Sequence, residues 1–129
     1  MSQPIIYNKF KSENYDQRKF DISLIIIHFT ETKTFNDALN LLTSEDRKVS
    51  SHYLIDKSGD IFNLVDLDKR AWHAGESMWG NYDDINSRSI GIEIVNSGEV
   101  IIEDYTTKQI NSLSVLLKGL LKFLALIKF

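Results

Sequence analysis

The chain has 129 residues, enough for one domain with a core of its own. Its hydrophobic fraction of 43% and charged fraction of 26% are typical of a soluble globular protein, and its net charge of −3 does not indicate a nucleic-acid footprint. Because it has no cysteine, disulfides and thiolate metal sites are excluded, and any metal would have to be held by histidine and carboxylate side chains.

The two ends of the chain differ in character. Residues 1–22 are polar and mixed, which predicts an irregular lead-in to a domain over residues 23–129. The lead-in has no apolar core of signal-peptide length, so a cytoplasmic location is expected. The most apolar segment, "SVLLKGLLKFLALIKF", is interrupted by Lys118 and Lys122 and is shorter than a bilayer requires. We therefore expect a buried helix and no membrane span.

The first predicted elements lie between residues 23 and 66. "SLIIIHF" is a continuous apolar run with β-branched residues, which predicts a strand buried on both faces. A helix is expected next, since Thr34 and Asp37 have the spacing of a helix start. "VSSHYLIDKSGDIFNLVD" then predicts two strands joined by a turn at Gly59.

The second half of the chain opens with a long polar and aromatic stretch, residues 66–88. A loop of this length inside a compact domain is usually functional. "SIGIEIV" predicts another buried strand, and a final helix begins where Thr106 and Gln109 form a capping box. Its expected apolar stripe is Ile110, Leu113, Leu117, Leu120 and Leu124. The order of elements indicates a mixed α/β domain.

Two polar residues interrupt the apolar strands. His28 ends the first strand, where open α/β sheets place ligands, although a structural histidine is the alternative. Glu93 alternates with isoleucines and shares its face with Gly91 and Val95. A buried carboxylate needs a cation, a donor, water or a cavity, and burial would raise its pKa toward the range useful for proton transfer. A structural salt bridge or an exposed sheet face is the alternative.

Other candidate residues carry weaker signals. We expect His52 to be structural, and His73, which follows Trp72 in the long loop, to line a cleft. The three histidines have the residue type of a zinc site, but their wide spacing has no motif value. Arg70 and Arg88 have the fork geometry that binds carboxylates, although solvation at the surface is the simpler role.

Four sequence blocks carry a family resemblance. "LIIIHFTET", "VSSHYLIDKSGDIFNLVD", "RAWHAGES" and "NSRSIGIEIVNSG", in this order and at these separations, resemble zinc-dependent N-acetylmuramoyl-L-alanine amidases, a group related to peptidoglycan recognition proteins. The resemblance extends to about residue 125. It implies a mixed central β-sheet flanked by helices, a zinc cofactor at one end, and peptidoglycan fragments as partners. The reaction it implies is cleavage of the amide between N-acetylmuramic acid and L-alanine.

The resemblance also assigns roles to individual residues. It implies that His28 is the first zinc ligand and that Glu93 is the catalytic carboxylate beside the metal. The residues it places along the substrate groove are Trp72, His73, Ala74 and Gly75. The chemistry agrees, because zinc polarises a carbonyl and activates water, and a nearby carboxylate can carry the proton.

The chain departs from the family pattern at its C-terminal end. Family members continue past the last helix into a loop with two further zinc ligands, whereas here no histidine follows His73 and no carboxylate follows Asp104. We therefore expect an amidase-like domain that lacks its last part, weak zinc binding and an exposed apolar surface. Three interpretations stay open: an amidase complemented by a C-terminal fragment from another chain, a catalytically inactive muropeptide-binding module, and a remnant of a disrupted gene.

Overall fold

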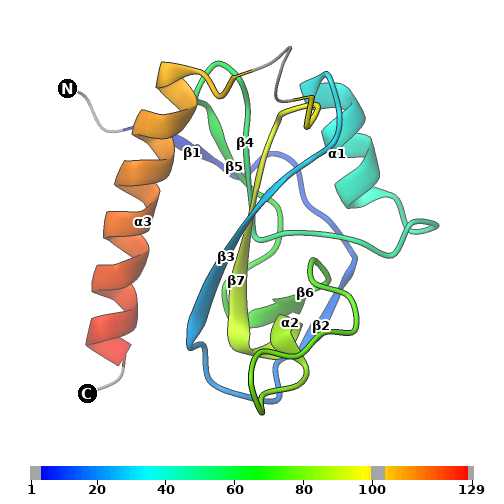
Figure 1. The fold of residues 1–129 in the computed structure, drawn as a ribbon, viewed down its shortest axis with the longest axis vertical. Helices are drawn as coiled ribbons and strands as arrows, with labels where there is room; N and C mark the ends of the chain where they lie inside the picture. Colours follow the sequence, from blue (N-terminus) through cyan, green and yellow to red (C-terminus); the bar gives the residue numbers. More distant parts are fainter. Residues whose placement is uncertain (1–3, 100–103, 128–129) are drawn as a thin grey trace.

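The structure, a computed structural model, describes residues 4–99 and 104–127. In these residues the helices are α1 (Phe35–Thr43), α2 (Ile85–Arg88) and α3 (Thr107–Ile127). The strands are β1 (Ile6–Tyr7), β2 (Tyr15–Gln17), β3 (Leu24–Phe29), β4 (Tyr53–Ile55), β5 (Ile61–Asn63), β6 (Lys69–Ala71) and β7 (Ser89–Ile94). Figure 1 shows α1 and α3 on opposite sides of the central sheet. The predicted mixed sheet flanked by helices is confirmed.

The central sheet has the order β1-β5-β4-β7-β3, and β2 pairs with β6 in a separate two-stranded sheet. The β4–β5 hairpin is antiparallel, as predicted around Gly59, and the other central pairs are parallel. The prediction of an irregular lead-in over residues 1–22 is wrong in part, because β1 and β2 lie within it. These strands have two and three residues, too few to produce a readable hydrophobic period.

β3 and β7 are neighbours with different surroundings. β7 lies between β4 and β3 and is buried along nearly all its length, as predicted. β3 is an edge strand, so the prediction that it is buried on both faces is wrong: Ile27 and Phe29 are each 45% exposed. A continuous apolar run is compatible with either position, because hydrophobicity alone does not show how many neighbours a strand has.

Two apolar layers form the core, one on each face of the sheet. The layer under α3 contains Ile22, Tyr53, Ile55, Ile61, Ile90, Ile92, Leu116, Leu120 and Leu124. The layer under α1 contains Ala38, Leu42, Leu54, Phe62, Leu64 and Val95. The predicted alternation along β7 is therefore confirmed, since Ile90 and Ile92 face α3 whereas Val95 faces α1.

Both long helices begin where the sequence predicts. The backbone N–H of Asp37 donates to Oγ1 of Thr34 at 3.1 Å, which caps α1. At α3 the Gln109 N–H donates to Oγ1 of Thr106, and the Thr106 N–H donates to Oε1 of Gln109, each at 3.0 Å. These reciprocal bonds form the predicted capping box.

The buried stripe of α3 differs from the prediction. The buried residues are Gln109, Ser112, Leu116, Leu120 and Leu124, whereas Ile110 is 47% exposed. Leu113 and Leu117 lie at the margin of the core. The polar residues turn inward because Gln109 donates to the Val95 carbonyl and Ser112 donates to the Gly59 carbonyl. The expected buried helix is thus buried on one stripe only.

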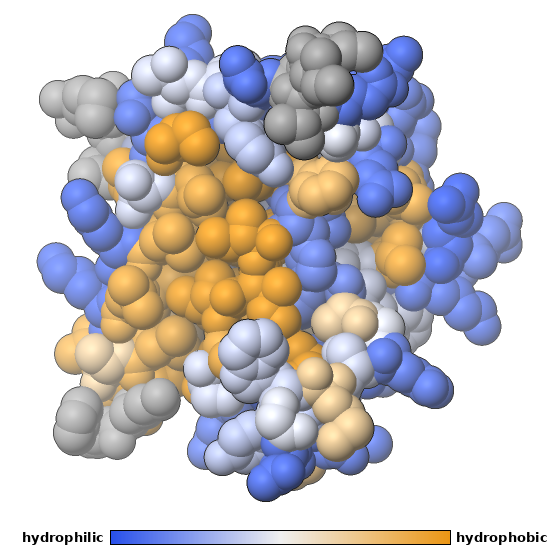
Figure 2. Space-filling model, viewed as in Figure 1, coloured by the Kyte–Doolittle hydropathy of each residue, from blue (hydrophilic) through white to orange (hydrophobic). Residues whose placement is uncertain are grey.

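α3 also has the length and apolar composition of a membrane-crossing helix. The argument that this segment is too short for a bilayer is therefore wrong, because the helix begins at Thr107, before the apolar segment itself. Figure 2 shows apolar surface over α3 and the neighbouring part of the sheet, which agrees with the expected exposed apolar face. The large apolar side chains that α3 exposes are Ile110, Leu121, Phe123, Leu126 and Ile127.

Candidate functional site

The site begins with two neighbouring residues on β3 and β7. His28 and Glu93 are partners in the parallel register of these strands, so their side chains lie on the same face of the sheet. This face is opposite to the one that packs against α3, because Glu93 alternates with Ile92. The structure therefore brings together the two residues that interrupt the apolar strands.

All three histidines meet at this face of the sheet. The ring of His73 lies 5.2 Å from that of His28 and 6.2 Å from that of His52, measured between centroids. Gly91 makes room for this cluster, since a Cβ atom there would lie 2.4 Å from Cγ and Cδ2 of His73. The wide sequence spacing of the histidines gave no signal of this proximity.

A chain of hydrogen bonds links two of the histidines to α2. Ser89 Oγ donates to the Ile85 carbonyl at 2.7 Å and lies 3.0 Å from Nε2 of His73. Nδ1 of His73 lies 3.0 Å from Nε2 of His28. Burial lowers the pKa of His28, and it lowers the pKa of His73 to about 3, with a smaller contribution from the neighbouring His28.

His52 has the structural role that the sequence predicts. Its ring is fully buried, Nδ1 accepts from the Gly91 N–H at 3.0 Å, and Nε2 donates to the Lys69 carbonyl at 2.8 Å. Burial lowers the pKa of His52 to about 4. Since both ring nitrogens are bonded to backbone groups, neither is available to a ligand.

The Glu93 carboxyl group is the most unusual group of the site. Its Oε2 atom is buried and has no hydrogen-bond partner among the described residues. Burial raises the pKa of Glu93 to about 8, and the negative charge of Glu31 contributes in the same direction. A carboxyl group that titrates near neutral pH can both accept and donate a proton in a reaction.

The segment from Trp72 to Gly75 is held by its backbone. The Trp72 N–H donates to Oγ of Ser50 at 2.9 Å. The N–H groups of His73 and Ala74 both donate to Oδ1 of Asn86, at 3.0 and 2.8 Å. Asn86 lies on α2, and no motif in the sequence indicated its role. This bond pair fixes the segment beside the histidine cluster.

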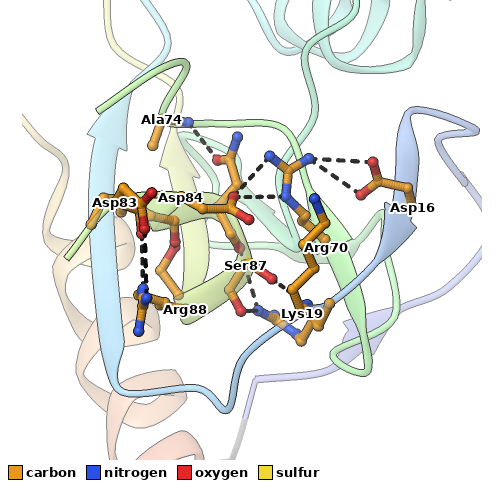
Figure 3. Close-up of polar contacts among 12 residues, drawn as sticks. Asp16, Lys19, Arg70, Ala74, Asp83, Asp84, Ser87 and Arg88 are labelled. Carbon is orange, nitrogen blue, oxygen red and sulfur yellow. Dashed lines mark hydrogen bonds and ion pairs between the residues drawn. The ribbon is translucent and has the colours of Figure 1, made fainter. Parts of the chain in front are cut away.

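A groove of about 770 Å³ adjoins this segment and includes Gly75 in its lining. Figure 3 shows the ionic contacts along it. Nη2 of Arg70 lies 2.9 Å from Oδ1 of Asp84, and Nη1 lies 3.3 Å from Oδ1 of Asp16. The sequence predicted a long loop here, but β6 and α2 both lie within it and support the groove.

The predicted surface roles of the two arginines are wrong. Arg70 is held between two carboxylates, as described above. Arg88 contacts Asp83 at 3.7 Å, and its guanidinium lies 3.7 Å from the ring centre of Phe20. Both guanidinium groups therefore have intramolecular partners, and the groove offers no unpaired Arg70 fork to a ligand carboxylate.

The described residues do not fit a zinc site by themselves. No group of three or more histidine, aspartate or glutamate side chains among them is arranged to hold a metal ion. His52 is excluded as a ligand by its backbone bonds, and the contact between His28 and His73 is a hydrogen bond. A zinc site made from the three histidines alone is thus contradicted, and the donor set is incomplete for a catalytic zinc.

Comparison with known proteins places the chain among the amidases. Residues 17–127 match the N-acetylmuramoyl-L-alanine amidase family. The chain is similar to the N-acetylmuramoyl-L-alanine amidase AmiD of Escherichia coli K12, with 39% identity over 84 residues, which cover 60% of this chain and 29% of AmiD. It therefore matches less than a third of the length of that relative.

Solved structures show the same relationship. A selenomethionine derivative of AmpD matches with a TM-score of 0.75 and 26% identity, covering 95% of this chain and 75% of the other. AmpDh3 from Pseudomonas aeruginosa, in complex with anhydromuramic pentapeptide, matches with a TM-score of 0.69 and 35% identity, covering 92% of this chain and 51% of the other. On this evidence the chain belongs to the N-acetylmuramoyl-L-alanine amidase family.

Proposed function

We propose that this chain is a hydrolase of peptidoglycan fragments that cleaves the amide between N-acetylmuramic acid and L-alanine. The observation that carries the proposal is the buried Oε2 atom of Glu93 beside His28, which has no hydrogen-bond partner among the residues that the structure describes, within an amidase fold. The related AmpDh3 structure contains an anhydromuramic pentapeptide, which supports an anhydromuropeptide as the substrate class. Gly75 lines the groove, and the preceding residues Trp72, His73 and Ala74 are proposed to contact such a substrate beside it.

Glu93 is proposed to carry the proton of the reaction. Its carboxylate accepts a proton from the attacking water as the new C–O bond forms. The resulting carboxylic acid then donates this proton to the leaving nitrogen as the C–N bond breaks. A pKa of about 8 suits this exchange, because both the carboxylate and the carboxylic acid are accessible near neutral pH.

His28 is proposed as the one zinc ligand that the described residues contribute. The family is zinc-dependent in general, but a single histidine gives weak metal binding. We therefore propose that full zinc affinity requires ligands from outside the described residues, such as a complementing C-terminal fragment. Glu93 and the segment from Trp72 to Gly75 are held by contacts among the described residues.

The test is hydrolysis of an anhydromuramoyl peptide, with and without added zinc, followed by mass spectrometry of the released peptide. Because one histidine binds zinc weakly, we expect turnover by the wild type only with zinc in excess, and a loss of about 10²-fold or more in Glu93→Gln under the same conditions, the usual contribution of a general base. Glu45→Gln, which changes an exposed glutamate, is the matched control and should keep the wild-type rate. Equal rates for Glu93→Gln and wild type would contradict the role of Glu93.

A second candidate function is binding of muropeptides without hydrolysis. The incomplete zinc donor set among the described residues favours it. In that case calorimetry would show binding of the same anhydromuramoyl peptide, whereas no product would form at any zinc concentration. Absence of both binding and turnover would contradict both functions.

A further inference from the structure

We infer that Ser89 and His73 hold the ring of His28 in a single tautomer, with its hydrogen on Nε2 and its free electron pair on Nδ1. His73 is then a positioning residue, in addition to its place in the segment beside the groove. The importance of this arrangement for catalysis rests on the proposed function, but the arrangement itself follows from three hydrogen bonds.

The direction of each hydrogen bond in this series follows from the first one, which joins Ser89 to α2. The carbonyl of Ile85 can only accept, so the Ser89 hydroxyl must donate its one hydrogen to it across 2.7 Å. The Ser89 oxygen is therefore an acceptor toward His73. Because Nε2 of His73 lies 3.0 Å from this oxygen, Nε2 must carry the hydrogen.

The same reasoning extends to His28. A neutral imidazole carries one ring hydrogen, so Nδ1 of His73 has a free electron pair. The 3.0 Å contact between Nδ1 of His73 and Nε2 of His28 then requires a hydrogen on Nε2 of His28. The remaining nitrogen of His28, Nδ1, has a free electron pair and no hydrogen bond to any described residue.

The surroundings hold these hydrogen-bonded side chains in place. Ser89 is fully buried, so water does not compete for its hydroxyl group. Asn86 holds the backbone of His73, and Gly91 leaves the space that its ring occupies. His28 itself lies on β3, paired along its whole length with β7. The structure thus selects Nδ1 as the atom that His28 presents to the site.

The experiment is ¹⁵N NMR of the histidine rings at about pH 8, above the ordinary histidine pKa of about 6.5. In the wild type we expect His28 to show a pyrrole-type Nε2 and a pyridine-type Nδ1. Ser89→Ala removes the acceptor that orients His73, so His28 should show both tautomers and intermediate shifts. Ser89→Thr keeps the hydroxyl and should restore the wild-type shifts.

A matched control separates this effect from general loss of structure. Ser112→Ala also removes a serine hydroxyl that donates to a backbone carbonyl, at 2.6 Å, but on the α3 side of the sheet. It should leave the His28 signals unchanged. A pyrrole-type Nδ1 in the wild type, or wild-type His28 shifts in Ser89→Ala, would overturn the inference. Neither substrate nor metal is needed, so these outcomes are independent of whether the chain hydrolyses muropeptides.

Discussion

The two faces of β7 carry different chemistry, although their residues alternate along one strand. On one face Ile90 and Ile92 are fully buried in the layer under α3. On the other face Gly91 lies under the ring of His73, and Glu93 has a buried carboxyl oxygen with no hydrogen-bond partner in the described part of the chain. Burial of apolar area on the first face stabilises the fold, whereas burial of titratable groups on the second opposes it. Alternate residues of β7 therefore have different roles: those on one face stabilise the fold, and those on the other face form the candidate site.

The largest expected effect concerns the polar face of β7, the face that carries Gly91 and Glu93, and tests how much the buried Glu93 lowers the free energy of unfolding. The pKa of Glu93 is raised from 4.5 to about 8, so the folded protein keeps a proton that the unfolded chain loses. Stability from this group is present below pH 4.5 and is lost as the pH rises to about 8. Glu93→Gln does not titrate, so its advantage over the wild type should grow across this window by up to about 5 kcal/mol.

Urea unfolding of both proteins between pH 4.5 and 8.5 measures this advantage. Titration of the histidines contributes equally to both free energies of unfolding, because both proteins contain them, so it cancels in the difference. Glu45→Gln should show a flat difference from the wild type, since it changes an exposed side chain. A flat difference for Glu93→Gln as well would mean that Glu93 is solvated, and the contrast between the faces would be lost.

The apolar face should respond to truncation instead of pH. Ile92→Ala removes buried methyl groups under α3 and should lower the free energy of unfolding by about 2–5 kcal/mol. Ile27→Ala, on the edge strand at 45% exposure, should cost roughly 1 kcal/mol or less. Urea unfolding at pH 7 compares them. The expected contrast fails if the two substitutions cost the same, because burial would then not distinguish β7 from β3.

Gly91→Ala introduces bulk on the polar face. The added methyl would overlap the His73 ring, so either the ring or the strand must shift, at a cost of about 1–3 kcal/mol. We also expect the ring signals of His28 and His73 to change in ¹⁵N spectra, which Ile92→Ala should not cause. Unchanged histidine spectra in Gly91→Ala would show that the ring does not pack over β7 as described.

Local patterns were the predictable part of the fold. The alternation along β7 and the capping residues Thr34, Thr106 and Gln109 act within a few neighbouring residues, so the sequence displays them directly. The edge position of β3 depends on which strands pair, which no local pattern records. Inward-facing Ser112 was missed for the same reason, because its partner is the distant Gly59 carbonyl.

The site was predictable in its residues but not in its geometry. His28 and Glu93 could be selected because polar residues in apolar strands are costly unless they have a role. The meeting of His52 and His73 with His28 depends on the long-range pairing of β3 and β4 with β7, and on the position of the segment that follows β6. Asn86 was missed entirely, because an amide that holds backbone groups leaves no pattern in the chain.

The smallest effect concerns a charge at the margin of the polar face. Glu31 raises the pKa of Glu93, although burial is the larger cause. Glu31→Gln removes this repulsion, so the pKa of Glu93 should fall by less than burial has raised it, and should stay above its ordinary value. Carboxyl ¹³C NMR titration of Glu93 measures the change, and Glu45→Gln provides the control.

The same substitution sharpens the comparison of the two faces. If Glu31→Gln lowers the pKa of Glu93, the wild-type loss of stability with rising pH should end at a lower pH in this variant. The variant would then be slightly more stable than the wild type near pH 8 and equal to it near pH 4.5. An unchanged pKa would mean that burial in the sheet accounts for the whole increase in the pKa of Glu93, and that the charge of Glu31 has no part in it.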